Sequence, residues 1–231
     1  LEEPHKVAER IGRAHSDIEN LLEEMASKGQ IFRHRKGNIV RYCAIPFVLG
    51  IYEYQLGRMD KELAQHFEDY LQEAFHKSVL GHTSLMRPVP VKESIEPDSM
   101  IATYDDAKQI ISQQKKIAVA DCICQKQQEL IGQGCNNPKE VCLIFGANGQ
   151  YFIDNNMGRE ISHDEALEIL KKSHEAALVV QMAGPQNPGG MCNCCGDCCA
   201  VLRALKKFQN PTEMILSNYY ATVDQTECTL C

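Results

Sequence analysis

The chain has 231 residues, a hydrophobic content of 44% and a formal net charge of -7 at pH 7. This length and hydrophobic content are enough for two globular cores, and the acidic balance disfavours a protein that coats nucleic acid or anionic membrane through bulk charge. No segment approaches about 20 consecutive apolar residues, and the charged N-terminus lacks the apolar stretch of a signal peptide. We therefore expect a cytoplasmic protein without a membrane span.

The first elements predicted along the chain are two helices and a hairpin. Val7, Ile11 and Ala14 share one helical face, and a second apolar stripe follows at Ile18, Leu21, Leu22 and Met25. We expect Ser16 or Asp17 to cap the second helix and Gly29 to end it. Residues 30–46 then predict two strands around a Lys36-Gly37-Asn38 turn. Together these elements resemble a winged-helix domain without its first helix.

The charges of this region bear on DNA binding. The predicted hairpin is basic, with Arg33, Arg35, Lys36 and Arg41, which suits phosphate contacts. The second helix, however, presents the carboxylates of Asp17, Glu19, Glu23 and Glu24, which a duplex would repel. We therefore disfavour nucleic acid as a partner and expect the N-terminal domain to serve protein packing, with a homodimer as one such use.

The cysteines divide the chain into two parts. Of twelve cysteines, Cys43 alone precedes Cys122, and Cys43 suits a small buried apolar position. We predict a winged-helix-like and helical domain over residues 1–85, a proline-rich linker over 86–100 and a cysteine-rich domain over 101–216. In a reducing compartment, such a density of thiols favours metal or redox chemistry over disulfides.

Four further local predictions complete the element order. Residues 60–79 carry the stripe of an amphipathic helix, and Thr103 and Asp105 stand where another helix could be capped. The sequence "GANGQ" at residues 146–150 is interpreted as a hairpin turn. Ser162 and Glu165 form a capping box that begins another helix.

A first group of thiols follows a short apolar segment. The sequence "KIAVADCIC" predicts a strand that delivers Cys122 and Cys124 to a site, and Cys135 and Cys142 follow around a loop with Gly132, Gly134 and Pro138. Four thiolates suit either a structural Zn²⁺ or an iron–sulfur cluster. Because zinc sites prefer two CxxC-type pairs, which this group lacks, the spacing favours a cluster.

A second group of thiols lies within eight positions, at Cys192, Cys194, Cys195, Cys198 and Cys199. Neighbouring cysteines rarely reach disulfide geometry, whereas a predicted helix N-terminus here would point backbone N–H groups at anionic sulfurs. The first group could hold one cluster and four members of the second another. Alternatively, the two groups could mix across space, since cysteines in iron–sulfur motifs often ligate the neighbouring cluster.

The end of the sequence adds a resemblance. Residues 217–231 end on Cys228-x-x-Cys231, which looks like the opening of a bacterial-type ferredoxin module that is truncated here. With the CxC, GxGC, PxExC and CNCCxCC elements, the chain resembles iron–sulfur proteins of anaerobes that join a winged-helix-like region, a cysteine-rich domain and a ferredoxin pair. The resemblance implies an α+β protein with an α/β cysteine-rich domain, one or two [4Fe-4S] clusters in this chain, more if the ferredoxin module is completed, and electron exchange with another oxidoreductase.

Three classes of function remain open. The leading hypothesis is an electron-transfer protein or subunit that works with a redox partner protein. The second is a redox- or metal-sensing winged-helix regulator, and the third is an interaction protein stabilised by Zn²⁺. We identify no catalytic set, because no nucleotide-binding loop and no nucleophile with a recognisable base are present. The chain is thus interpreted as a component of electron transfer more than as a self-contained enzyme.

Overall fold

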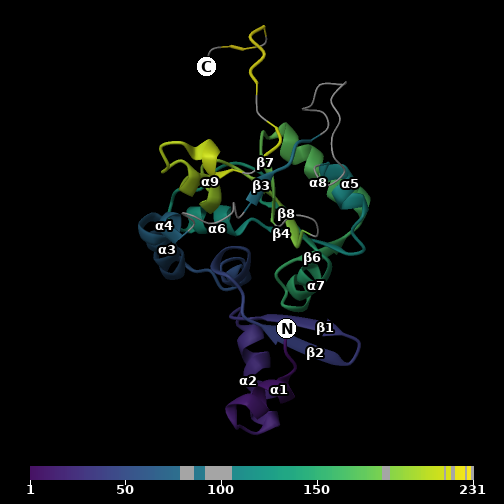
Figure 1. Cartoon of the computed structure of the whole chain (residues 1–231). Coiled ribbons are helices and arrows are strands. Elements are labelled where there is room, and N and C mark those ends of the chain that lie inside the picture. The colour runs from purple at the N-terminus through teal and green to yellow at the C-terminus, as the bar shows by residue number, and fades with distance from the viewer. Residues whose placement is uncertain are drawn as a thin grey trace.

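The computed structural model describes residues 1–78, 86–91, 106–183, 188–215, 217–219, 222–226 and 228–229. Helices and strands both contribute throughout (Figure 1), so the predicted α+β class is confirmed. Among these residues, no helix combines the length and the apolar character needed to cross a membrane.

The N-terminal elements follow the predicted order: α1 (Pro4–Ile11), α2 (His15–Ser27), β1 (Phe32–Lys36) and β2 (Ile39–Cys43). The two strands pair antiparallel around the expected turn. The predicted cap of α2 at Ser16 or Asp17 is wrong. Ala14 takes the extended backbone of an N-cap, with ψ 139°, so the helix begins before either side chain can cap it. Whether these elements form a winged helix stays a prediction.

Gly29 ends α2, as predicted, and has a second role. Its φ of +70° lies in the left-handed region, where glycine is favoured after a helix. A Cβ at this position would also lie 2.6 Å from the carbonyl oxygen of Tyr54. Glycine is therefore needed both to end the helix and to let the next segment approach it.

Residues 47–78 form an irregular turn followed by a long helical segment. In the turn, Leu49 has a left-handed φ of 61°, which is strained for a branched side chain. The helical segment confirms the prediction for residues 60–79 over its described part. It comprises α3 (Lys61–Tyr70), one wider helical turn (Leu71–Phe75) and α4 (His76–Ser78). The carboxylate of Asp60 caps α3 by accepting from Leu63 N at 2.8 Å.

The rest of the chain builds a six-stranded sheet in the order β3-β7-β8-β5-β4-β6, in which all the pairs are antiparallel. The strands are β3 (Met86–Pro88), β4 (Ile117–Asp121), β5 (Glu140–Phe145), β6 (Arg159–Ile161), β7 (Val179–Ala183) and β8 (Gly190–Cys194). The first residues of the predicted linker therefore form an edge strand, and Val89 and Val91 just after it are buried. Residues 92–100 lie outside the described ranges.

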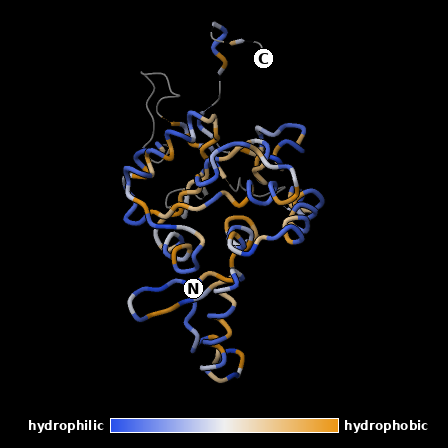
Figure 2. The backbone as a smooth tube through the Cα atoms, turned by 180° about the vertical axis from the view of Figure 1, so that it is seen from behind, coloured by the Kyte–Doolittle hydropathy of each residue, from blue (hydrophilic) through white to orange (hydrophobic). Residues whose placement is uncertain are grey.

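Helices cover both faces of the sheet (Figure 1). On one face, α5 (Ala107–Ser112) and α8 (His163–Glu175) pack over Ile117, Val119 and Leu143. On the other face, α7 (Gly146–Asp154) packs with the N-terminal elements over Ala120 and Ile144. Alternate residues of β4 and β5 thus enter different cores, as the period of two in a strand requires. Figure 2 shows hydrophobic segments gathered toward the centre of the molecule.

Two short helices at the end of β4 and after β8 complete this part, α6 (Ile123–Leu130) and α9 (Ala200–Leu205). Of the predicted caps, Ser162 is confirmed as the cap of α8, since Glu165 N donates to Ser162 Oγ at 3.1 Å. The reciprocal half of the predicted capping box is not formed, because the Glu165 carboxylate pairs with Arg159 Nη2 at 2.6 Å. Helix α5 is capped by Asp106, whose carboxylate accepts from Lys108 N at 2.9 Å. Thr103 and Asp105 lie outside the described ranges.

The hairpin turn predicted at residues 146–150 is wrong, because these residues begin helix α7. Gly146 has a left-handed φ of +56°, which turns the chain out of β5. A Cβ at Gly149 would lie 2.8 Å from the carbonyl oxygen of Ile144 and 3.5 Å from Ala118 Cβ. The glycines therefore serve the exit from the strand and close packing of α7 on the sheet.

One continuous core joins the N-terminal elements to the sheet. It contains Ala26, Tyr52 and Phe75 together with Ile123, Tyr151 and Ala204. The hydroxyl of Tyr151 on α7 donates to the carbonyl oxygen of Ala26 at 2.5 Å. The predicted division into domains at residues 86–100 stays a prediction, and the two proposed parts pack directly on each other.

Candidate metal centre

The first group of thiols is placed by the end of β4 and by β5. Cys122 is the N-cap residue of α6 and Cys124 lies in the first turn of that helix. The strand predicted over "KIAVADCIC" therefore ends at Asp121, before either thiol. Cys142 lies on β5, opposite Ala120 of β4. These three thiols meet at one end of the sheet, on the face that carries α6 and α7.

The second group is placed by β8 and α9. Met191 enters the core under α8, so Cys192 and Cys194 on the same strand alternate with it and share the opposite face. Cys199 is the N-cap residue of α9. Gln181 Nε2 on β7 approaches Cys199 Sγ at 3.8 Å. The predicted helix N-terminus therefore carries one of the five thiols, and two others belong to a strand.

Six thiols from these elements lie close enough to shift one another's pKa in a closed sequence. Each thiol acts on the pKa of the two beside it, in the order Cys122, Cys124, Cys199, Cys194, Cys192, Cys142 and back to Cys122. We call this set the six-thiol ring. Its thiols come from four parts of the chain: the segment that follows β4, strand β5, strand β8 and the N-terminus of α9 (Figure 1).

The pKa values of the ring thiols alternate. Hydrogen bonds donated by two neighbouring thiols lower the pKa of Cys122, Cys199 and Cys192, the last to about 5. The thiols between them donate those hydrogen bonds, and their pKa is raised well above the ordinary value; these are Cys124, Cys142 and Cys194. The ring thus holds negative charge in a largely buried place, which is the setting of a cation-binding site.

The other three thiols form a separate set beside the ring, which we call the three-thiol site. The Sγ atoms of Cys135, Cys195 and Cys198 all lie within 4.8 Å of one another, with 3.6 Å between Cys135 and Cys195. Asn137 Nδ2 donates to Cys135 Sγ at 3.5 Å. Among the described residues, no further cysteine, histidine or carboxylate joins this set at the same spacing.

The paired cysteines explain how the two sets lie side by side. Cys194 belongs to the ring and Cys195 to the three-thiol site, and Cys199 and Cys198 divide in the same way. Members of both sets pack in one cluster with Val141 and Leu178. Each spatial set therefore contains thiols from both sequence groups, which is the second of the two arrangements that the sequence leaves open. At two places, Cys194–Cys195 and Cys198–Cys199, a single peptide bond joins a member of one set to a member of the other.

The remaining cysteines lie elsewhere. Cys43 is partly buried on β2, where it packs against the core, in line with the apolar position expected for it. Cys228 is exposed, and Cys231 lies outside the described ranges. The described residues around Cys228 form no strand, and Thr226 N instead donates to Asp224 Oδ1 at 2.8 Å. The ferredoxin-like module stays a prediction.

A buried polar network supports the ring from the N-terminal side, and sequence reasoning missed it. The hydroxyl of Tyr52 hydrogen-bonds to Gln127 and contacts the Cys124 thiol. Gln127 Nε2 and Gln128 Nε2 on α6 donate to Glu68 Oε2 at 3.0 and 2.7 Å. Two consecutive glutamines on a helix that begins with thiols were the available sequence signal, because burying both requires partners.

A cavity of ≈ 320 Å³ opens onto one edge of the ring. Cys142 and Cys192 line it, together with Leu49, Ile123, Phe152 and Glu53. Burial raises the pKa of Glu53 to about 8, against hydrogen bonds from the backbone N–H groups of Gly50, Glu53 and Leu49. An uncharged carboxyl group at pH 7 suits this largely apolar space.

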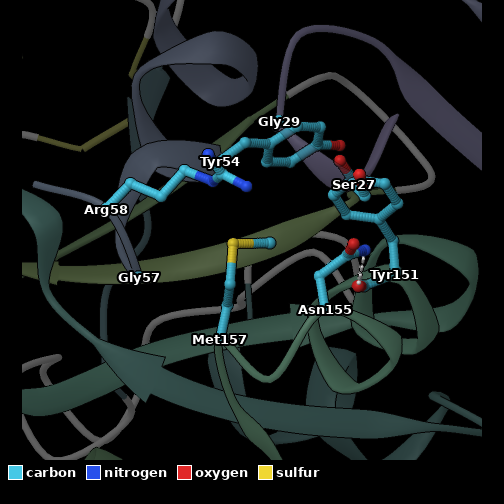
Figure 3. Close-up of a pocket in the computed structure, with 8 residues that line it drawn as sticks. All are labelled: Ser27, Gly29, Tyr54, Gly57, Arg58, Tyr151, Asn155 and Met157. Carbon is cyan, nitrogen blue, oxygen red and sulfur yellow. Dashed lines mark hydrogen bonds between the residues drawn. The ribbon is translucent and has the colours of Figure 1, made fainter. Parts of the chain in front are cut away.

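A second cavity, of ≈ 280 Å³, lies between the end of α2 and α7 (Figure 3). Figure 3 shows Tyr54 and Tyr151 along one side and Met157 across from them. Asn155 Nδ2 is held there by the carbonyl oxygen of Tyr151 at 2.8 Å. None of the thiols in the described part of the chain lines this cavity, so it is separate from the candidate centre.

The donor set fits soft metal ions. Nine thiols in two adjacent sets suit iron–sulfur clusters or thiolate-bound zinc, and the carboxylate and carbonyl oxygens preferred by Mg²⁺ or Ca²⁺ are not part of either set. Comparison of the chain with family models, curated proteins and solved structures gave no match.

Proposed function

We propose that this chain is an iron–sulfur electron-transfer protein or subunit that exchanges electrons with a partner oxidoreductase. The observation that carries the proposal is the pairing of two thiol sets that share one packed cluster of side chains. Centres this close to each other exchange electrons readily, whereas a structural metal site needs no second centre beside it. A [4Fe-4S] cluster, held by thiolates and tuned by its hydrogen bonds and exposure, supplies the redox chemistry.

Zinc explains the thiols less well. A structural Zn²⁺ takes four ligands in a closed tetrahedron, and neither a ring of six thiols nor a set of three matches that number. A cluster suits the three-thiol site, because a fourth iron can take a ligand from outside the protein. The proposal therefore assigns the thiols to iron and sulfide.

The charges of the N-terminal hairpin support the carrier over the regulator. Arg33 is buried and paired with Glu23, Arg35 Nη2 lies 2.9 Å from the same carboxylate, and Arg41 pairs with Glu3. Cations that are already neutralised contribute little to phosphate binding. A redox partner must come close to the thiols, so we expect its surface on the cysteine-rich side, near Cys142 and Cys192, which line a cavity.

The test is an anaerobic preparation of the full chain analysed for iron, acid-labile sulfide and zinc. We expect brown protein with equal iron and sulfide, a broad visible absorption that bleaches with dithionite, and reoxidation by a chemical acceptor. Cys43→Ser is the matched control and should keep the full iron content, because Cys43 lies outside both sets. Stoichiometric zinc without sulfide in the unmodified chain would refute the proposal.

A further inference from the structure

The cavity of ≈ 280 Å³ between the end of α2 and α7 has a distinctive charge. Its lining contains one cationic side chain, that of Arg58, and no carboxylate. The chain has a formal net charge of -7, and Arg33, Arg41 and Arg203 each pair with a glutamate. Within the described part of the chain, by contrast, the Arg58 guanidinium has neither an ion pair nor a hydrogen bond. It is therefore a positive group that an anionic ligand can pair with.

The cavity has a covered apolar end and an open polar end. Tyr54, Tyr151 and Met157 are 7%, 1% and 9% exposed, so they form the covered end. Ser27 and Arg58 are exposed and mark the open end. Figure 3 shows Arg58, Met157 and the two tyrosines around one space. A ligand that fills this space would bury an apolar body and keep a charged group at the mouth.

The aromatic side of the cavity is held in place by the fold. The ring centroids of Tyr54 and Tyr151 lie 4.3 Å apart, with 31° between the ring planes. The Tyr151 hydroxyl donates to the carbonyl oxygen of Ala26, and Gly29 leaves room for the backbone of Tyr54 to approach α2. Aromatic rings and a methionine thioether make favourable contacts with another flat ring. The covered end therefore suits an aromatic group.

The ends of α2 and α7 do not use the guanidinium. A helix C-terminus leaves its last carbonyl groups without partners inside the helix, and a nearby arginine can bind them. Here other donors serve, because Ala26 O accepts from Gly29 N and Tyr151 O accepts from Asn155 N, both at 3.1 Å. The donors of Arg58 therefore remain free for a ligand, and their planar fork matches the two oxygens of a carboxylate.

We propose that this cavity binds a small aromatic carboxylate, with its ring at the covered end and its carboxylate on the Arg58 guanidinium. The cavity volume of ≈ 280 Å³ suits a molecule with a single ring. The ligand would touch the end of α2, the segment before α3 and helix α7, so its binding stabilises the packing of the N-terminal elements on the sheet. This site is independent of iron, because none of the described thiols lines it.

Nuclear magnetic resonance of the full chain, with ¹³C in the methionine methyl groups, tests this proposal. The chain has eight methionines, and Met157→Leu identifies the signal of Met157. We expect benzoate to shift that signal in a saturable manner. Benzamide, which has the same shape without the charge, and acetate, which lacks the ring, should each bind at least about tenfold more weakly.

A pair of arginine variants tests the charged end of the cavity. Arg58→Gln should weaken benzoate binding by about tenfold and leave benzamide binding unchanged. Arg13→Gln is the matched control, because Arg13 is also exposed and has no ion pair among the described residues. It should bind benzoate like the unmodified chain.

Three results would overturn the proposal. Equal binding of benzoate and benzamide would show that the charge is not recognised. A shift of other methionine signals with that of Met157 unchanged would place the binding elsewhere. Tighter binding of phenyl phosphate than of benzoate would show that a carboxylate is the wrong ligand class. The probe series on the unmodified chain decides even if a variant fails to fold, and iron analysis tests the electron-transfer function separately.

Discussion

Arg203 on α9 and Glu68 on α3 form an ion pair across 135 residues of sequence, with 2.9 Å between Arg203 Nη1 and Glu68 Oε2. The same carboxylate accepts from Gln128 on α6. Helix α6 carries Cys124 and Cys199 is the N-cap of α9, and these two thiols are neighbours in the six-thiol ring. Glu68 therefore ties together the two helices that close one side of the ring.

This ion pair predicts a dependence of stability on pH. Burial alone would raise the pKa of Glu68, but hydrogen bonds from Arg203, Gln72 and Gln128 outweigh burial and lower it to about 2. Because the folded-state pKa lies below the ordinary 4.5, the carboxylate stabilises the fold above pH 4.5, and that contribution is lost as pH falls toward 2. We expect Glu68→Gln to lower the free energy of unfolding at pH 7 by about 2 kcal/mol.

Urea unfolding of the metal-free chain, followed by circular dichroism, measures this effect. The difference between the unmodified chain and Glu68→Gln should shrink steadily between pH 4.5 and pH 2. Glu62→Gln, on an exposed position of the same helix, is the matched control and should change stability by less than about 0.5 kcal/mol. A difference that is constant across this pH range would contradict the assignment.

Neighbouring cysteines should affect different centres. Cys194→Ala removes a thiol of the six-thiol ring, whereas Cys195→Ala removes a thiol of the three-thiol site. Electron paramagnetic resonance of the dithionite-reduced protein should show two signals in the unmodified chain. We expect Cys194→Ala to change one of them and Cys195→Ala the other. Identical spectra for the two variants would show that both thiols serve one centre.

The buried arginine of the hairpin should act on stability. Arg33 is 6% exposed, pairs with Glu23 and lies over the ring of Tyr151 at 5.9 Å. Arg33→Ala removes a buried side chain together with its ion pair to the partly exposed Glu23 and its packing on Tyr151, and should lower the free energy of unfolding by about 2 kcal/mol. Lys36→Ala, at an exposed position of the same strand, should have little effect in thermal unfolding. Equal melting temperatures for the two variants would count against a structural role for Arg33.

Close packing of α7 on the sheet gives a further prediction. A Cβ at Gly149 would lie 2.8 Å from a backbone oxygen, which cannot move without shifting β5. We expect Gly149→Ala to lower the free energy of unfolding by about 2 kcal/mol. At Gly57 a Cβ would meet no atom within 4 Å, so Gly57→Ala is the control. Denaturant titration of both variants measures the difference, and a neutral Gly149→Ala would mean that α7 can move away from the sheet.

Much of the fold follows from local sequence patterns. The apolar stripes of α2 and α3, the capping residue Ser162 and the Gly29 terminator all act within a few residues of themselves, so the sequence alone identifies them. The hairpin turn predicted at residues 146–150 was wrong, because α7 (Gly146–Asp154) begins there. Gly149 lets this helix pack against β4, a strand that is distant in the sequence. Propensity is a weak guide wherever such tertiary contacts decide the conformation.

The candidate site was predictable in its residue types but not in its grouping. The density of thiols indicates metal chemistry from the sequence alone. Which thiols share a centre depends on the alternation of side chains along β8 and on the order of strands β7, β8, β5 and β4. Strand order is a long-range property, so the separation of Cys135 from Cys122 and Cys142 has no signal in their spacing.

Assembly of the ring from four separate segments also sets the order of biogenesis. No short peptide of this chain brings the six thiols together, so the sheet must close and α9 must dock before a complete centre can be held. If the proposed clusters are bound, iron and sulfide must therefore reach a protein that is already nearly folded. The cavity beside Cys142 and Cys192 is then the route by which a cluster could enter from a scaffold protein. Leu49, whose backbone is strained, lines the same cavity.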